Sequence, residues 1–179
     1  MTGTGAPHPK QLRVMLLGAT GTIGRATARA LHNDGHDVVC LVRPGAPALP
    51  DGVVTRVGQV TDQNSLRQDG FRGEAFDVLV SCLASRSGAP KDAWAIDHDA
   101  HVIALAEARR AGVRHVVLLS AICVQKPKLA FQHAKLSFEK ALLASGLACS
   151  IVRPTAYFKS LSGQISRVRK PTRWPSISR

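Results

Sequence analysis

The stretch Val14-Met15-Leu16-Leu17-Gly18-Ala19-Thr20-Gly21-Thr22-Ile23-Gly24 decides the fold of this 179-residue chain. Its apolar run is typical of a buried strand and ends in three glycines, and a helical pattern over 25–33 follows at once. We expect Gly18 to reverse the backbone, Gly21 to let the main chain approach a phosphate, and Gly24 to let the helix pack against the strand. The N-terminus of that helix would then offer N–H groups and a partial positive charge to a pyrophosphate.

The segment after the first helix supports a dinucleotide site. Residues 37–42 are predicted as a second strand, which completes a strand–helix–strand unit around the glycines. Arg43 follows this strand, where sites selective for NAD usually place Asp or Glu on the ribose 2′-hydroxyl. A cation there suits a 2′-phosphate, so the sequence predicts NADPH as the cofactor. A turn without a ligand and a solvated surface Arg43 are the alternatives.

Apolar and helical segments alternate along the rest of the chain. Strands are predicted over 12–17, 37–42, 53–57, 76–82, 115–120 and 148–152. Helices are predicted over 23–33, 62–68, 92–111 and 131–145. This alternation predicts an α/β fold with a doubly wound parallel sheet, the Rossmann NAD(P)-binding fold. We expect a polar N-terminal tail over 1–10, an NADP-binding domain over 11–164 and an irregular basic tail over 165–179.

Composition excludes several classes of protein. Hydrophobic residues make up 45% of the chain, which favours a globular domain over disorder. No apolar run is long enough to span a membrane, and the N-terminus lacks the apolar segment of a signal peptide, so a cytoplasmic location is expected. The net charge is +12, but aromatic residues are few and several cations fall in the last stretch, so a solvated basic surface is favoured over nucleic-acid binding.

The cysteines and histidines do not indicate a metal centre. The four cysteines form no C-x-x-C pair, so we expect buried reduced thiols at Cys40, Cys82, Cys123 and Cys149. Two histidines fall three residues apart in the predicted helix 92–111, but no third ligand is suggested.

Three loops are expected at the carboxyl edge of the sheet, where doubly wound folds bind ligands. They are 82–86, 120–123 and 153–157, and they would surround the nicotinamide end of a dinucleotide. The predicted cofactor-binding residues come from these loops, the glycine segment and the following elements: Gly18, Thr20, Gly21, Thr22, Ile23, Arg43, Cys82, Leu83, Ala84, Lys135, Pro154 and Tyr157.

Two residues resemble part of the catalytic set of short-chain dehydrogenases. Ser120 ends a strand and Lys135 lies in the next helix, where that family places a Ser and a Tyr-x-x-x-Lys motif. Phe131 stands at the Tyr position and cannot donate a proton, so ordinary alcohol–ketone chemistry is not expected. Ser120 and Lys135 are predicted as catalytic residues, with Lys135 on the nicotinamide ribose. A Ser that bonds nearby backbone and a surface Lys are the alternatives.

Longer segments resemble the divinyl chlorophyllide 8-vinyl-reductases, which are atypical relatives of the short-chain dehydrogenases. The similarity runs over about 13–164 and is carried by 81–98, 120–127, 131–136 and 150–161. It implies NADPH-dependent reduction of the 8-vinyl group of divinyl chlorophyllide or protochlorophyllide to ethyl, in chlorophyll or bacteriochlorophyll biosynthesis. The vinyl group is conjugated to the macrocycle, so its reduction forms no oxyanion and the missing Tyr fits. Lys135 would position the ribose and relay a proton.

Members of that family are much longer, and their substrate-binding part lies largely beyond the sixth strand. Because the similarity stops after Gln164, we expect a truncated form that keeps the cofactor half, binds NADPH weakly and has little reductase activity. A non-catalytic NADP(H)-sensing regulator is the alternative, and a nucleotide-sugar epimerase is disfavoured by the missing Tyr. The resemblance implies a tetrapyrrole as partner and leaves contact with photosynthetic membranes open, and the sequence does not define the oligomeric state.

Overall fold

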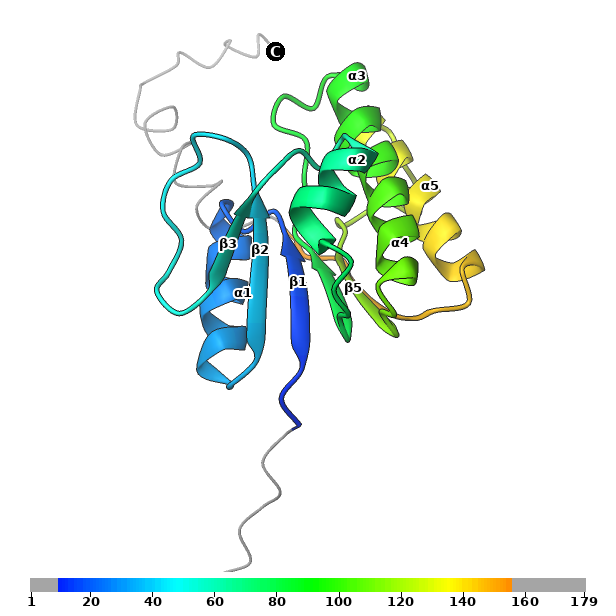
Figure 1. Ribbon diagram of the computed structural model, residues 1–179. Helices are drawn as coiled ribbons and strands as arrows, with labels where there is room; N and C mark the ends of the chain where they lie inside the picture. Colours follow the sequence, from blue (N-terminus) through cyan, green and yellow to red (C-terminus); the bar gives the residue numbers. More distant parts are fainter. Residues whose placement is uncertain (1–9, 156–179) are drawn as a thin grey trace, which may run out of the picture.

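The computed structural model describes residues 10–155, which form a six-stranded sheet with helices packed on it (Figure 1). The strands are β1 (Arg13–Leu17), β2 (Asp37–Val42), β3 (Val54–Val57), β4 (Val78–Ser81), β5 (His115–Leu119) and β6 (Ala148–Val152). Every neighbouring pair is parallel, in the order β3-β2-β1-β4-β5-β6. The chain therefore winds outward in opposite directions from β1 and β4, and the predicted doubly wound fold is confirmed.

The helices cover the two faces of the sheet unequally. They are α1 (Thr22–Asn33), α2 (Gln63–Ser65), η1 (Leu66–Phe71), α3 (Pro90–Ala93), η2 (Trp94–Asp99), α4 (Ala100–Arg110) and α5 (Ala130–Ala144). Within the described residues, α1 packs on one face, whereas η1, α4 and α5 pack on the other (Figure 1). The predicted helix 92–111 corresponds to α3, η2 and α4, which follow one another directly and include a π-helical segment at η2.

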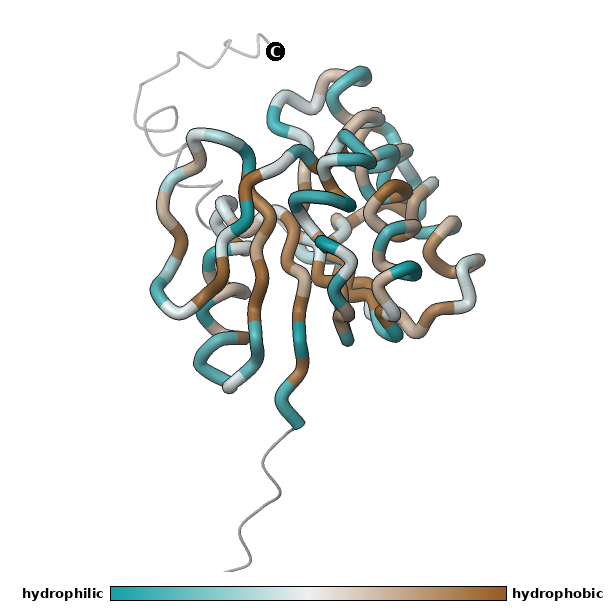
Figure 2. The backbone as a smooth tube through the Cα atoms, in the orientation of Figure 1, coloured by the Kyte–Doolittle hydropathy of each residue, from teal (hydrophilic) through white to brown (hydrophobic). Residues whose placement is uncertain are grey.

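Side chains of the first strand alternate between two cores. Met15 and Leu17 belong to the core under η1, α4 and α5, whereas Val14 and Leu16 belong to the core under α1. Figure 2 shows the central strands as the most apolar part of the described chain. A strand buried on both faces must be apolar throughout, which explains why β1 shows no polar alternation. Because β1 is buried on both faces, its carboxyl end, where the glycine segment begins, is held in place by both cores.

One predicted helix extends further than expected. The helix predicted over 62–68 continues to Phe71, because η1 is π-helical and its wider turn brings Leu66 and Phe71 to the same core. Its start is correct, since the Asp62 carboxylate accepts hydrogen bonds from the N–H groups of Asn64 and Ser65 at 2.8 and 3.0 Å. All but the last residue of the predicted N-terminal tail over 1–10, the predicted tail over 165–179 and the predicted ligand Tyr157 lie outside the described residues.

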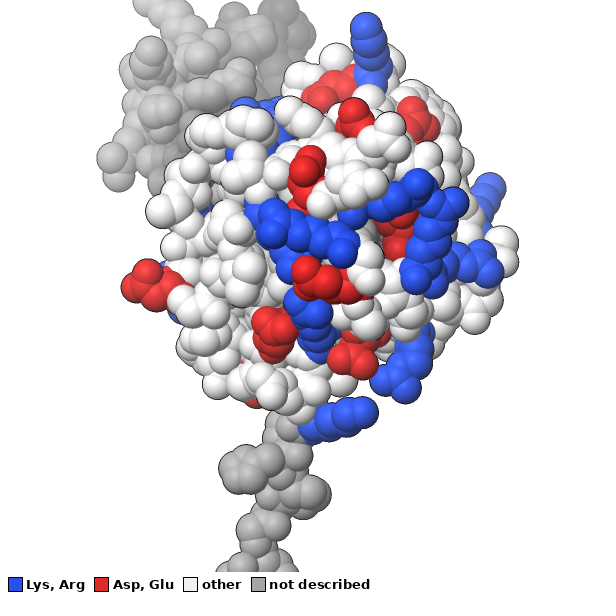
Figure 3. All heavy atoms as spheres, viewed as in Figure 1, with Lys and Arg blue, Asp and Glu red and all other residues white. Residues whose placement is uncertain are grey.

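Basic and acidic side chains are interspersed on the face seen in Figure 3. Glu107 is 2% exposed and pairs with Arg67 at 2.9 Å and Arg110 at 3.3 Å, and Glu74 pairs with both Arg13 and Arg56. Much of the positive charge on this face is therefore locally balanced. Among the helices that the structure describes, none has the length and apolar character needed to cross a membrane.

Candidate functional site

The fold itself requires glycine at two positions of the glycine segment. Gly18 has φ +77°, and a Cβ there would lie 2.6 Å from the carbonyl carbon of Cys82. A Cβ on Gly24 would lie 2.1 Å from the carbonyl oxygen of Gly18. At Gly21, by contrast, the nearest heavy atom is 3.5 Å away, which is ordinary van der Waals contact. The packing of the protein therefore leaves Gly21 unexplained, whereas a ligand that approaches the backbone at this point would explain it.

The N-terminus of α1 is suited to an anion. Gly21 is the N-cap residue, no side chain of the described residues caps the helix there, and no acidic residue lies in its first turn. Helix N-termini attract anions through their N–H groups and the aligned peptide dipoles. The absence of a Cβ at Gly21 and of an acidic cap together fit a pyrophosphate at this place.

A first cavity of about 280 Å³ lies beside the glycine segment. Its walls come from the glycine loop, the end of β2, the loop after β4 and the α3–η2 segment. It brings together seven of the predicted cofactor-binding residues: Gly18, Thr20, Gly21, Arg43, Cys82, Leu83 and Ala84. Thr22 and Ile23 do not line this cavity but begin α1 directly after Gly21. Arg86, Asp92 and Ile96 also line it and were not among the residues predicted from the sequence.

A second cavity of about 590 Å³ lies at the ends of β4, β5 and β6 and at the start of α5. It contains the other predicted residues within the described range, which are Ser120, Lys135 and Pro154, and Phe131 lines it too. The two cavities adjoin, because Leu83, Ala84 and Arg86 line both. Their adjacency matches an elongated ligand that reaches from the glycine segment to the end of β5.

Ser120 carries an unused hydrogen-bonding group in this second cavity. The residue is 5% exposed, and its Oγ has no hydrogen-bond partner among the described residues. A buried hydroxyl without a partner costs free energy, so such groups usually bind water or a ligand. The backbone N–H of Ser120 donates to the carbonyl oxygen of Val152, but its hydroxyl makes no bond to the described backbone, which was the alternative to a functional role.

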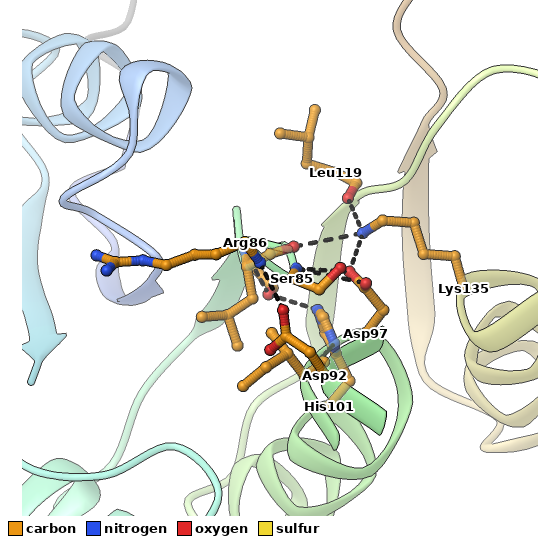
Figure 4. A network of polar contacts seen from close by, with 10 residues as sticks. Ser85, Arg86, Asp92, Asp97, His101, Leu119 and Lys135 are labelled. Atoms are coloured by element: carbon orange, nitrogen blue, oxygen red, sulfur yellow. Dashed lines mark hydrogen bonds and ion pairs between the residues drawn. The ribbon is translucent and has the colours of Figure 1, made fainter. Parts of the chain in front are cut away.

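Lys135 is held by three acceptors at the wall of the second cavity (Figure 4). Its Nζ lies 3.0 Å from Oδ1 of Asp97 and donates to the carbonyl oxygens of Leu83 at 3.3 Å and Leu119 at 3.4 Å. An ammonium group has three N–H donors, so these contacts use all of them. Binding of a ribose hydroxyl would therefore require Lys135 to share or exchange one of these partners.

Asp97 is a site residue that the sequence reasoning missed. It lies on η2, is 1% exposed and also faces the N–H of Ser85, 3.4 Å from each carboxylate oxygen. A signal was present, since Asp97 falls four residues after Ala93 and three before Ala100, both fully buried. An acid on the buried face of a helix needs a partner, and here the partner is Lys135.

His101 joins the end of β4 to η2 through two hydrogen bonds and is uncharged. Its Nδ1 lies 2.9 Å from the carbonyl oxygen of Ile96, and its Nε2 lies 2.8 Å from Oγ of Ser81. A carbonyl only accepts, so Nδ1 carries the proton and Nε2 accepts the Ser81 hydroxyl. Burial, and secondarily the positive charge of Lys135, lower the pKa of His101 to about 3. No group of histidine, cysteine and acidic side chains within residues 10–155 is arranged to hold a metal ion.

The pKa of His101 predicts how stability depends on pH. Below about pH 6.5 the His101 imidazole binds a proton in the unfolded state, whereas in the folded state it binds one only below about pH 3. Stability therefore falls as the pH is lowered through this window. We expect His101 to contribute a loss of about 2 kcal/mol in the free energy of unfolding between pH 7 and pH 5. Urea denaturation of the wild type and of His101→Gln at several pH values checks this. The free energy of unfolding of the variant should depend less on pH by that amount. Equal slopes would contradict it.

The prediction that all four cysteines are buried is wrong for Cys123. Cys40 is buried, and burial raises the pKa of its thiol to about 12, while Cys82 and Cys149 are half-buried. Cys123 is exposed and lies in the turn after β5, where its φ is 65°. All four thiols are free, as expected.

Sequence comparison identifies the ligand class of this site. The profile of a family described as NAD(P)H-binding matches residues 18–179. The chain belongs to this NAD(P)H-binding family. A nicotinamide dinucleotide fits the two adjoining cavities, the N-terminus of α1 with glycine at its N-cap, and the missing Cβ at Gly21.

Two curated proteins are similar in sequence to this chain. The divinyl chlorophyllide a 8-vinyl-reductase of Oryza sativa subsp. indica is 44% identical over 177 residues, which cover 90% of this chain and 44% of the rice protein. The reductase of the same name from Cucumis sativus is 40% identical over 181 residues, which cover 92% of this chain and 43% of that protein. Both are described as chloroplastic. The predicted resemblance is confirmed, and the chain spans less than half the length of these relatives.

Solved structures support the fold. The Bordetella bronchiseptica enzyme WbmH, in complex with NAD+, superposes with a TM-score of 0.73 at 17% identity, over 88% of this chain and 64% of that one. At this level of identity the match indicates a shared fold and nothing about the substrate.

Proposed function

We propose that this chain is the NADPH-binding part of a reductase that converts the 8-vinyl group of divinyl chlorophyllide or protochlorophyllide to an ethyl group. The observation that carries the proposal is 40–44% identity to named 8-vinyl-reductases along about nine-tenths of the chain. The two adjoining cavities support it, because one contains the glycine segment and the other contains Ser120 and Lys135.

In this proposal each part of the site has a separate task. The N-terminus of α1 and the glycine segment bind the pyrophosphate, and Arg43 binds the 2′-phosphate. When bound, NADPH supplies the hydride. Ser120 offers its unpaired hydroxyl to the ligand in the second cavity, and Lys135 binds the nicotinamide ribose and holds the proton that completes the ethyl group.

Phe131 is consistent with reduction of a carbon–carbon double bond. It lines the second cavity at the position where a catalytic Tyr would deliver a proton to a carbonyl oxygen. Reduction of a conjugated vinyl group spreads the developing charge into the macrocycle and builds no alkoxide. The site therefore needs an apolar wall at this point rather than a phenolic acid.

The proposed activity is tested with the purified chain and with a chimera in which residues 10–155 replace the matching part of the rice relative. NADPH is titrated by nucleotide fluorescence, and divinyl chlorophyllide is then added while its absorption spectrum is recorded. Saturable NADPH binding and a shift of the pigment bands to shorter wavelength, in either protein, support the reductase. NADPH binding with no pigment conversion in either protein contradicts it and favours an NADP(H)-sensing regulator.

The assignment of Arg43 to the 2′-phosphate makes a separate prediction. Arg43 is exposed at the end of β2 and lines the first cavity, so Arg43→Gln should leave the fold unchanged. We expect the Kd for NADPH to rise about tenfold while that for NADH stays constant, because only NADPH carries the 2′-phosphate. Arg109→Gln on α4 is the matched control, since it removes the same charge away from both cavities. An equal rise in the Kd of both nucleotides in Arg43→Gln would show that Arg43 does not bind the 2′-phosphate.

A further inference from the structure

Arg86 occupies the junction between the two cavities. It lies in the loop after β4, and it is one of the few residues that line both spaces. We propose that its guanidinium binds the pyrophosphate of the dinucleotide, across the first cavity from the N-terminus of α1. The inference rests on the proposed binding of NADPH and adds a residue to that site.

The backbone of this loop is fixed by two carboxylates. Asp92 accepts hydrogen bonds from the N–H of Arg86 at 3.0 Å, the N–H of Ser87 at 2.9 Å and the Ser87 hydroxyl at 2.8 Å. Asp97 faces the N–H of Ser85 at 3.4 Å. Because these N–H groups are already occupied by the protein, the loop presents the Arg86 side chain to a ligand rather than its backbone.

The guanidinium of Arg86 is available to an anion. In Figure 4 the side chain extends away from Lys135 and toward the elements at the start of the chain. Within the described range it has no carboxylate partner, whereas six other arginines are paired: Arg13, Arg56, Arg67, Arg110, Arg114 and Arg153. Asp92 is close, and the charge of Arg86 contributes to lowering its pKa, but the hydrogen bonds of that carboxylate come from Ser87 and from the backbone N–H of Arg86.

The position of Arg86 favours the pyrophosphate over the other anionic groups. Arg43 lines the first cavity and is absent from the wall of the second, as expected for a group at the adenosine end. Ser120 and Lys135 line only the second. A dinucleotide that spans both cavities has its pyrophosphate in the middle, where the two cavities share Arg86. The planar guanidinium suits two phosphate oxygens at once, and Arg86 and Gly21, the N-cap residue of α1, line the same first cavity.

The test measures the Kd of NADPH, NADH and 2′-AMP for the wild type, Arg86→Gln, Arg86→Lys and the control Arg109→Gln, with NADPH fluorescence as the signal. The two dinucleotides contain a pyrophosphate and 2′-AMP does not. We expect Arg86→Gln to raise the Kd of NADPH and NADH by the same factor of about tenfold and to leave 2′-AMP unchanged. Arg86→Lys should recover part of the affinity, because lysine keeps the positive charge but lacks the paired N–H donors of the guanidinium.

The outcomes separate this inference from the proposed function. A wild type that binds none of the nucleotides refutes the proposed function before any variant is compared. If the wild type binds NADPH and Arg86→Gln binds it equally well, only the role of Arg86 is refuted. An effect on NADPH and 2′-AMP without one on NADH would assign Arg86 to the 2′-phosphate instead. Thermal melting followed by circular dichroism confirms that the variants fold, as expected for an exposed side chain without a carboxylate partner among residues 10–155.

Discussion

Replacement of Lys135 by Met is expected to lower the free energy of unfolding by roughly 3–5 kcal/mol, because it leaves the Asp97 carboxylate buried without its counter-ion. The side chains of Lys135 and Asp97 are 6% and 1% exposed, and their charged atoms are 3.0 Å apart. Urea denaturation at pH 7 measures the change. A loss below about 1 kcal/mol, the range typical of surface pairs, would contradict this assignment.

A double variant separates stability from chemistry. Lys135→Met combined with Asp97→Asn removes both charges and keeps an oxygen that can accept from the N–H of Ser85, so most of the lost stability should return. This folded protein without the amine then tests the proposed role of Lys135. We expect it to bind NADPH more weakly than the wild type and, in the chimera with the rice relative, to lose turnover. Full turnover by the double variant would show that Lys135 is not required for the reaction.

Gly24→Ala is expected to lower stability strongly, whereas Gly21→Ala is expected to leave it nearly unchanged. A Cβ at Gly24 would lie 2.1 Å from the carbonyl oxygen of Gly18, so Gly24→Ala must displace backbone and should cost about 3 kcal/mol or more in stability. A Cβ at Gly21 meets nothing closer than 3.5 Å, and the φ of −73° suits alanine. Gly21→Ala should therefore change stability by less than about 1 kcal/mol.

The same pair distinguishes a packing glycine from a ligand glycine. Because the methyl group of Gly21→Ala would enter the space assigned to the pyrophosphate, its Kd for NADPH should rise about tenfold or more. Denaturant melts and NADPH titrations of both variants check the two halves of the prediction. Unchanged NADPH affinity in a folded Gly21→Ala protein would show that the phosphate does not approach this backbone. A Gly24→Ala protein as stable as the wild type would show that α1 can move away from β1.

The sequence alone determined the order of elements and the edge of the sheet at which the two cavities lie. Each strand and helix follows from a local pattern: the apolar run before Gly18 forms β1, and the pattern after Gly21 forms α1. Arg43 could be placed at the end of β2 because a strand that is buried on both faces stands out as a continuous apolar run. Such patterns have periods of two or 3.6 residues, so they are visible without knowledge of the rest of the chain.

Only the tertiary structure decided which side chains meet in the site. The ion pair of Lys135 with Asp97 joins α5 to η2, and no local pattern contains both residues. That the Ser120 hydroxyl and the Arg86 guanidinium have no protein partner within residues 10–155 likewise depends on what lies opposite them in space. Local hydrophobic periodicity sets which face of an element is buried, whereas the partner of a buried polar group is set by how the helices pack across the sheet. That packing depends on the whole fold, so the sequence could name the candidates but not their contacts.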